Sequence, residues 1–166
     1  MTAAIGPVTL ADTQQVSAIE AAVFADPWSA NSFRSLHGDP RVFFACAREP
    51  GDGAGSTPGV VPGAADRVLG YVVAIFAADE GEIANLAVAP DAQGRGLGGG
   101  LLDAALAEAE RRGARVLYLE VRESNHAARA LYRSRRFEEA GRRRGYYRRP
   151  VEDALLLRRI VEPRLK

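Results

Sequence analysis

A glycine-rich stretch lies between an apolar segment and a segment with helical periodicity. It runs Gln93-Gly94-Arg95-Gly96-Leu97-Gly98, and Gly99 and Gly100 extend it. Glycines let a backbone approach a ligand closely, and the N–H groups at the start of a helix attract anions such as phosphates. Arg95 would add a full positive charge. Glycines inside a helix cost about 0.5–1 kcal/mol each relative to alanine, so we expect a bound ligand or close packing to offset that cost.

The residues around the glycines indicate which classes of phosphate-containing ligand could bind there. No Lys-Ser/Thr pair follows them, which excludes the nucleoside-triphosphate P-loop. The dinucleotide pattern G-x-G-x-x-G does match at Gly94, Gly96 and Gly99, and Glu120 lies about 20 residues further on, where a ribose-binding acid belongs. However, a segment with Pro90 separates the strand from the first glycine, and only about 45 residues follow Glu120. A dinucleotide-binding domain is therefore the weaker interpretation.

Strands and helices alternate around this stretch. Apolar runs predict strands over residues 8–10, 42–47, 68–77, 82–88 and 115–121, and two last strands at Phe137 and over 154–160. Helical spacing predicts four helices. The first is capped by Asp12, has Phe24 on its apolar face and ends at Asp26-Pro27, and the second is capped by Ser29 and runs through Leu36. The third runs from Leu97 to Gly113, and the fourth is capped by Asn125 and runs through Tyr132. The order β-α-α-β-β-β-α-β-α-β-β predicts a mixed α/β domain with one sheet covered by helices.

Length and composition fit a single domain. The chain has 166 residues, of which 47% are apolar, enough for one packed core over 1–166. Residues 49–66 are rich in Gly, Pro, Ala and Asp without a period, so we expect a long hairpin loop there rather than a linker. No apolar run approaches the ~20 residues that cross a bilayer, and the start of the chain lacks a signal-peptide pattern. We therefore expect a soluble, cytoplasmic protein.

Cysteine and histidine are scarce. Cys46 is the only cysteine, and His37 and His126 are the only histidines. This composition excludes a disulfide framework and disfavours a zinc site, so no metal is expected. Cys46 lies in an apolar segment and is expected to be a small buried hydrophobe rather than a nucleophile.

Charge is distributed unevenly along the chain, although the net charge is only +1. Residues 1–110 hold 5 arginines and 14 acidic residues, whereas residues 111–149 hold 13 arginines and 4 acidic residues. A basic surface of this kind attracts phosphates, nucleic acid or an acidic partner. The alternative is that the arginines only keep the chain in solution, since Lys166 is the single lysine.

These segments together resemble the GCN5-related N-acetyltransferase (GNAT) family. The acetyl-CoA signature of that family, Gln/Arg-x-x-Gly-x-Gly/Ala after an apolar strand and a Val-x-Pro turn, is matched by residues 93–98 after residues 85–90. Within the family the chain is similar to the bacterial enzymes that acetylate the N-terminal alanine of a ribosomal protein. That similarity runs from about residue 5 to 160, through Pro27-Trp28-Ser29, Leu119-Glu120-Val121-Arg122, Ala130-Leu131-Tyr132, Tyr146-Tyr147 and Glu152-Asp153-Ala154.

Two departures from the family pattern stand out. Gly99 occupies a position where relatives often carry Arg or Lys, which removes one possible phosphate contact. The 49–66 loop is longer than is usual in the family. The resemblance still implies a single central, mostly antiparallel sheet flanked by helices, with splayed central strands.

The resemblance also implies a reaction, the transfer of an acetyl group from the thioester of acetyl-CoA to an amine. Glu120 would be the general base, because apolar neighbours on its strand desolvate its carboxylate; the alternative is a surface pair with Arg115 or Arg122. Tyr132 would be the general acid, since a phenol with a pKa of ~10 is protonated at neutral pH; the alternative is a core aromatic residue. The cosubstrate would bind to residues 93–99 and to the backbone N–H groups of Leu86, Ala87 and Val88. Asn125 would also contact it, although this residue could instead cap its helix.

Five further residues are candidates for contact with the acceptor substrate. The resemblance places Trp28 beside the substrate groove, although a residue of this type is often only a packing anchor. Tyr146 and Tyr147 could form a wall of the groove or simply lie on a strand. Asp79 and Glu80 could receive a cationic substrate, but a solvated turn is the simpler interpretation.

The sequence thus predicts an acetyl-CoA-dependent N-acetyltransferase that modifies a protein N-terminal α-amine, with a ribosomal protein as its partner. An α-amine has an unperturbed pKa of ~7.7–8.0, against ~10.4 for lysine, so it needs less help from a base. Lysine or a small-molecule amine is the alternative within the same chemistry. A non-catalytic module that binds RNA or the ribosome through the arginine-rich third is the alternative of a different class; catalysis itself would need neither nucleic acid nor a membrane.

Overall fold

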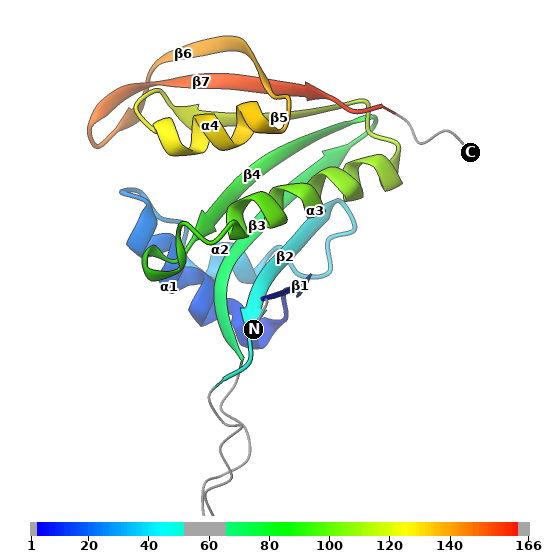
Figure 1. Cartoon of the computed structure of the whole chain (residues 1–166), viewed down its shortest axis with the longest axis vertical. Coiled ribbons are helices and arrows are strands. Elements are labelled where there is room, and N and C mark those ends of the chain that lie inside the picture. The colour runs from blue at the N-terminus through cyan, green and yellow to red at the C-terminus, as the bar shows by residue number, and fades with distance from the viewer. Residues whose placement is uncertain (1–2, 52–65, 163–166) are drawn as a thin grey trace, which may run out of the picture.

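Two parallel strands, β4 (Glu80–Val88) and β5 (Val116–Arg122), lie at the centre of a seven-stranded sheet in the computed structural model. The structure describes residues 3–51 and 66–162. The strand order is β1-β2-β3-β4-β5-β7-β6, and every neighbouring pair except β4 and β5 is antiparallel (Figure 1). The other strands are β1 (Ala4–Pro7), β2 (Val42–Glu49), β3 (Arg67–Ala77), β6 (Glu138–Arg148) and β7 (Val151–Ile160). The mixed, mostly antiparallel sheet expected from the sequence is confirmed.

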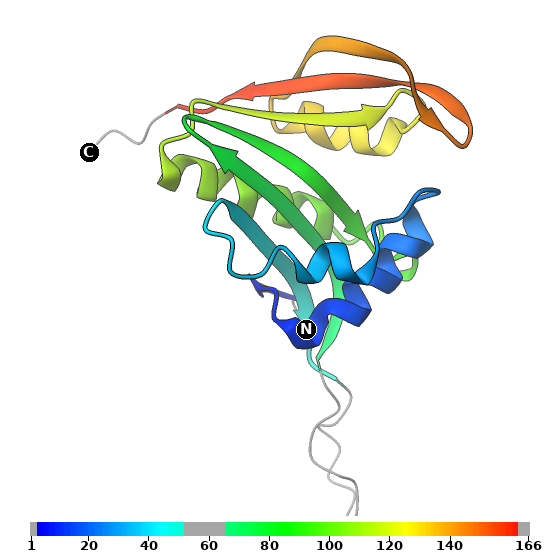
Figure 2. The same ribbon diagram turned by 180° about the vertical axis from the view of Figure 1, so that it is seen from behind.

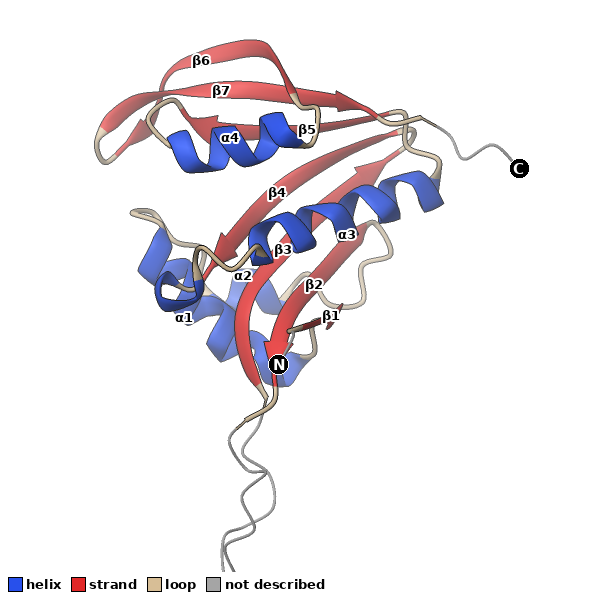
Figure 3. Cartoon of the chain, viewed as in Figure 1, coloured by secondary structure: helices blue, strands red, loops and turns tan. Residues whose placement is uncertain are grey.

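Helices cover both faces of this sheet (Figure 3). They are α1 (Thr13–Val23), α2 (Ala30–Arg34), α3 (Leu97–Arg112) and α4 (His126–Ser134), with 3-10 turns η1 (Leu10–Asp12) and η2 (Pro90–Ala92). One apolar cluster packs the buried side of α3 and the end of α4 against the sheet, and it includes Leu101, Leu102 and Tyr132. A second cluster packs α1 and α2 on the opposite face, around Val16 and Phe33 (Figure 2).

Cys46 lies in the second cluster. Its side chain is fully buried on β2, as expected from the apolar segment around it. Burial raises the pKa of the thiol to about 11, which leaves it protonated at neutral pH.

Several predicted boundaries differ from those of the structure. The first strand is Ala4–Pro7 rather than 8–10, because Thr9 donates from both its backbone N–H (2.7 Å) and its hydroxyl (3.0 Å) to Asp12 and turns the chain into η1. Helix α1 ends at Val23, and Phe24 is already extended, three residues before Pro27. The second helix stops at Arg34 rather than Leu36.

The later boundaries differ less. Strand β4 begins at Glu80, so the turn after β3 is shorter than predicted and places Ala78 at a φ of 53°. The two last strands start after Phe137 and at Val151 and are longer than predicted. The caps at Ser29 and Asn125 are confirmed, since each side chain accepts a hydrogen bond from the backbone of its helix. The 49–66 loop lies outside the described residues over positions 52–65.

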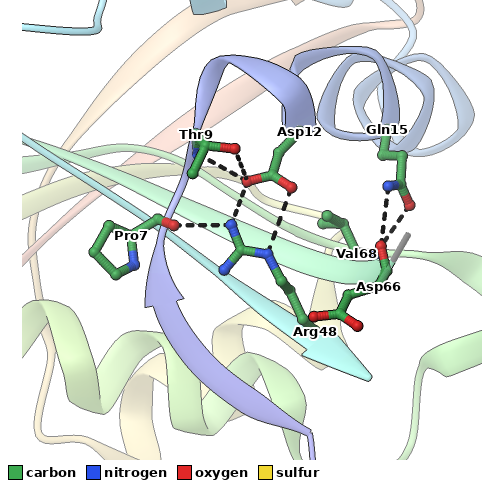
Figure 4. A network of polar contacts seen from close by, with 7 residues as sticks. All are labelled: Pro7, Thr9, Asp12, Gln15, Arg48, Asp66 and Val68. Atoms are coloured by element: carbon green, nitrogen blue, oxygen red, sulfur yellow. Dashed lines mark hydrogen bonds and ion pairs between the residues drawn. The ribbon is translucent and has the colours of Figure 1, made fainter. Parts of the chain in front are cut away.

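A polar network fixes the start of the chain to the outer strands (Figure 4). The Asp12 carboxylate accepts hydrogen bonds from Thr9 and from the Arg48 guanidinium, which also donates to the Pro7 carbonyl at 2.9 Å. Gln15 joins α1 to the start of β3, because its side-chain oxygen accepts a hydrogen bond from the Val68 N–H at 2.9 Å. Burial alone would raise the pKa of Asp12, but the hydrogen bonds from Arg48 and Thr9 outweigh it and hold that pKa below its ordinary value.

Replacement of Asp12 by asparagine is expected to lower the free energy of unfolding by about 1.5–3 kcal/mol at pH 7, because charged hydrogen bonds are lost from a buried position. Since the folded pKa lies below the unfolded value of ~3.9, the stabilisation is complete well above that value and is lost as the pH falls through the folded pKa. Urea unfolding of wild type and Asp12→Asn at several pH values measures this difference.

The matched control is Asp79→Asn. The Asp79 side chain is 60% exposed and lies 3.8 Å from Arg115, a surface pair that should contribute little. Equal destabilisation by both substitutions, or a difference for Asp12→Asn that does not shrink near pH 3, would contradict the assignment.

Candidate active site

Strands β4 and β5 pair over only part of their length. Their parallel register runs from Glu80 opposite Val116 to Ile83 opposite Leu119 and then stops. On the other side of β4 the register with β3 shifts between Val73 and Ala74, which leaves Ala84 as an extra residue. Such a bulge bends a strand, so β4 and β5 diverge beyond this point (Figure 1). The splayed central strands expected from the resemblance are confirmed.

A groove of about 910 Å³ lies where the strands part. The N–H groups of β4 beyond Ile83 that point away from β3 have no strand partner among the described residues. The groove is lined by residues 82–86 of β4, residues 119–122 of β5, Asn125, Ala128 and Tyr132 near α4, residues 146–150 of the β6–β7 hairpin, and Glu20, residues 23–26 and Trp28 around α1. It therefore brings together Glu120, Tyr132, Asn125, Leu86, Trp28, Tyr146 and Tyr147 from the residues predicted to form the site.

Glu120 sits on β5 just past the last paired position. Its side chain is only 16% exposed, and its carboxylate forms an ion pair with Arg143 Nε of β6 at 2.8 Å. The alternative, a surface pair with Arg115 or Arg122, is not formed: Arg115 pairs with Asp79, and Arg122 pairs with Glu152 at 3.4 Å. Glu120 is thus held in the groove by a residue that follows it by more than twenty positions in the chain.

A second carboxylate, that of Glu82 on β4, lines the same groove. Burial and the nearby charge of Glu120 raise the pKa of Glu82, while Arg143 acts in the opposite direction. Sequence analysis missed this residue. An acidic residue at the start of the mostly apolar predicted strand 82–88 was the signal that could have identified it.

Tyr132 projects from α4 into the first apolar cluster, where its ring packs against Phe137 at 5.8 Å between centroids. Its ring is therefore a core residue and also lines the groove, so both interpretations of Tyr132 hold for its position. Burial, helped by the neighbouring Tyr147, raises the pKa of Tyr132 well above its ordinary value. The phenol is protonated throughout the neutral pH range and can act only as a proton donor there.

The two adjacent tyrosines of β6, Tyr146 and Tyr147, also line the groove. Burial, followed by the charge of Glu120, raises the pKa of Tyr147 to about 12. The negative charge of Glu120 is the main cause that raises the pKa of Tyr146. The guanidinium of Arg122 stacks over the Tyr147 ring at 4.2 Å, which ties the hairpin to β5.

Glu20 is the other residue that sequence analysis missed. Its side chain is 1% exposed, and three groups from different elements donate to it: the Trp28 N–H (3.0 Å), the Asn85 side-chain amide (2.8 Å) and the Tyr71 hydroxyl. Burial, with the Glu20 charge, raises the pKa of Tyr71. One carboxylate therefore fixes both the α1–α2 segment and the bulged part of β4. A charged residue on the apolar face of a helix was its signal in the sequence.

The glycine loop follows η2, which separates it from β4, and leads into the first turn of α3 (Figure 1). Gly94 and Gly96 both adopt a φ of 80°, and a Cβ on either would meet open space. Gln93 donates to the Val88 carbonyl at 3.2 Å, and Arg95 lies 3.5 Å from Glu49. Several residues predicted to bind the cosubstrate do not line the groove itself, namely Ala87, Val88 and 93–99. They lie between the part of β4 that lines the groove and the first turn of α3.

The three helical glycines at the start of α3 face side chains of other elements at different distances. A Cβ on Gly98 would lie 3.4 Å from Leu131, one on Gly99 would lie 2.5 Å from the Arg135 guanidinium, and one on Gly100 would lie 3.1 Å from Ile5. The first turn of α3 therefore faces side chains from α4, from Arg135 and from β1.

Asp79 and Glu80 do not reach the groove. They stand at the turn between β3 and β4, at the end of β4 where β5 is still paired with it. The Asp79 carbonyl accepts from the Arg115 N–H at 2.7 Å, which makes this turn part of the sheet edge. Both residues therefore lie away from the groove, so the structure does not place them where they were expected to contact the substrate.

The described ranges 3–51 and 66–162 contain no helix that is long and apolar enough to cross a membrane. Within those same ranges, no three His, Cys, Asp or Glu side chains gather in a way that could hold a metal ion.

The sequence matches the acetyltransferase (GNAT) family over residues 15–137. It is 36% identical over 143 residues to the [ribosomal protein bS18]-alanine N-acetyltransferase of Escherichia coli strain K12, covering 84% of each chain. It is 39% identical over 157 residues to the N-alpha-acetyltransferase RimI of Mycobacterium tuberculosis, covering 93% of this chain and 90% of that one.

Solved structures agree with these similarities. The ribosomal-protein-S18-alanine N-acetyltransferase from Escherichia coli superposes with a TM-score of 0.79 at 32% identity, over 99% of this chain and 97% of that one. Arabidopsis thaliana NAA60 in complex with acetyl-CoA shares the fold, with a TM-score of 0.79 at 18% identity over 96% of this chain and 99% of that one. The chain belongs to the acetyltransferase (GNAT) family.

Proposed function

We propose that the chain acetylates the N-terminal α-amine of a protein, with the N-terminal alanine of a small-subunit ribosomal protein as its substrate. Membership of the family makes the chain an acetyl-CoA-dependent N-acetyltransferase. The observation that carries the proposal is the groove between β4 and β5, which presents a carboxylate and a protonated phenol from two different elements.

The glycine loop fits the phosphates of acetyl-CoA. Gly94 and Gly96 leave open space where side chains would otherwise stand, and the backbone N–H groups of the first turn of α3 are at its edge. When bound, acetyl-CoA supplies an activated acetyl group as a thioester. We assign the cosubstrate to residues 93–99, with Leu86, Ala87, Val88 and Asn125 beside its acyl end.

Glu120 and Tyr132 supply the proton transfers in this proposal. Glu120 accepts a proton from the substrate ammonium, and its ion pair with Arg143 fixes the carboxylate on the groove wall. Tyr132 donates its phenolic proton to the departing sulfur, since its raised pKa keeps the proton available. The N–H groups of β4 that lack a strand partner beyond Ile83 stabilise the negative charge on the acyl oxygen.

The acceptor would enter between Trp28 and the tyrosines of β6. Both line the groove, as do the carboxylates of Glu82 and Glu120, which suit an ammonium group. An α-amine is easier to deprotonate than a lysine, because its unperturbed pKa is lower by more than two units. The relatives named for acetylation of a ribosomal protein alanine support the same substrate class.

Acetyl-CoA is expected to raise the melting temperature of the wild type, since a ligand that binds only the folded state stabilises it by mass action. Gly96→Val should abolish that shift, because a branched side chain blocks the approach of the ligand to the backbone. Differential scanning fluorimetry with and without acetyl-CoA measures both effects.

Gly38→Val is the matched control, since Gly38 has the same φ of 80° and the same open surroundings but lies far from the glycine loop in the sequence. Both variants carry similar backbone strain, yet only Gly96→Val should lose the shift. An undiminished shift in Gly96→Val would place the cosubstrate elsewhere.

Peptides with a free N-terminal alanine should be acetylated in preference to lysine side chains. Mass spectrometry of one lysine-containing peptide, with its N-terminus free or blocked, decides this. Equal labelling of the blocked peptide would defeat the α-amine proposal and favour a lysine acetyltransferase. Binding of RNA without turnover of any amine would favour the non-catalytic alternative.

Glu120→Gln should reduce kcat/KM by roughly 10²–10⁴-fold, most strongly at low pH, where the substrate amine is mainly protonated. Tyr132→Phe keeps the buried ring and should lower kcat while acetyl-CoA binding changes little. The measurements are pH–rate profiles and melting temperatures for each variant.

Tyr118→Phe on β5 is the control for removal of a hydroxyl, since Tyr118 does not line the groove and its loss should leave the rate unchanged. If Glu120→Gln and Tyr132→Phe fold normally and keep wild-type rates at every pH, both residues are structural and the active site has been misassigned.

A further inference from the structure

Arg135 lies directly against the first turn of α3. It follows the last residue of α4, and its guanidinium occupies the space that a side chain at position 99 would need. A Cβ on Gly99 would come 2.5 Å from Nη2 and 3.1 Å from Cζ of Arg135. Gly99 is the third residue of α3, so the absence of a side chain there allows a cation from another helix to rest on the start of α3.

The guanidinium keeps donors available for a further acceptor. Nε and Nη2 donate to the two Asp103 oxygens at 3.1 and 3.2 Å, and Nη1 donates to the Ser134 hydroxyl at 3.0 Å. An arginine has five N–H donors, so two remain beyond these bonds among the residues that the structure describes. The side chain is 31% exposed and therefore open to a ligand in solution.

Arg135 is the cation whose contact with the first turn of α3 the structure shows. The first turn of α3 contains no acidic residue, and the arginines of α3 are in its last turn. Arg95 precedes the helix and faces Glu49. The pair of Arg135 with Asp103 is a surface pair in which Asp103 is 58% exposed, and such pairs contribute little, so the aspartate can yield to a stronger anion.

We propose that Arg135 binds a phosphate group of acetyl-CoA, from α4, at the first turn of α3. A phosphate would accept hydrogen bonds from the guanidinium and from the N–H groups of the helix start together. Asp103 then acts as a competitor for the same guanidinium. The inference rests on the proposed function, because the phosphate is that of the cosubstrate.

Substitutions of Arg135 and of Asp103 should have different effects on CoA binding. Arg135→Gln removes the cation and should weaken CoA binding about tenfold, which corresponds to the loss of a charged hydrogen bond that is partly exposed. Asp103→Asn removes the competing carboxylate and should leave the affinity unchanged or raise it. If the pair only tied α4 to α3, the two substitutions would break the same contact and would act alike.

Isothermal titration of CoA, 3′-dephospho-CoA and acetylated pantetheine into wild type, Arg135→Gln and Asp103→Asn tests this without measuring turnover. The phosphate-free pantetheine should bind all three proteins equally. A loss with CoA alone would assign the 3′-phosphate to Arg135, and an equal loss with 3′-dephospho-CoA would assign the diphosphate. Melting temperatures report any change in folding.

Equal CoA affinity of Arg135→Gln and wild type, or equal weakening by both substitutions, would overturn the inference. Neither result affects the proposed function, which instead fails if the wild type binds no CoA. Weakening of the pantetheine compound by Arg135→Gln would likewise overturn the inference, since that ligand has no phosphate to lose.

Discussion

Parallel pairing between β4 and β5 ends at Ile83 and Leu119, and the groove exists because the two strands are no longer paired beyond these residues. Up to this point the strands satisfy each other, and beyond it their facing N–H and C=O groups need another partner. The extra residue Ala84 turns β4 away, and Glu20 holds the bend through the Asn85 amide at 2.8 Å. A buried charge on α1 therefore helps to keep the two halves of the sheet apart, which gives the groove its room.

Elements whose signal is local could be predicted from the sequence. The order of strands and helices, the caps at Ser29 and Asn125 and the glycine-started α3 each depend on neighbouring residues. Strand β6 was predicted poorly, because an exposed edge strand rich in arginine has neither an apolar run nor a clean alternation. Glu20 and Glu82 were missed for a different reason: Glu20 meets Asn85, and Glu82 meets Glu120, only after distant segments have folded together.

The uneven charge of the chain is partly neutralised within the fold. Arg115 pairs with Asp79 and Arg135 pairs with Asp103, so arginines of the basic third reach acidic residues of the first part. Arg143 is engaged by Glu120 at 2.8 Å. Several arginines of the basic third are thus paired within the fold, which weakens the argument for a dedicated nucleic-acid surface.

The burial of Cys46 has a practical consequence for the study of this reaction. Each acetyl transfer releases a free thiol on CoA, and thiol-specific chromogenic reagents detect such a group continuously. The chain holds one cysteine, and its thiol is fully buried, with a pKa of about 11. Since those reagents react with exposed thiolates, the folded enzyme contributes no background colour of its own. A rise in absorbance therefore counts turnovers, and a burst of colour without substrate would report unfolding.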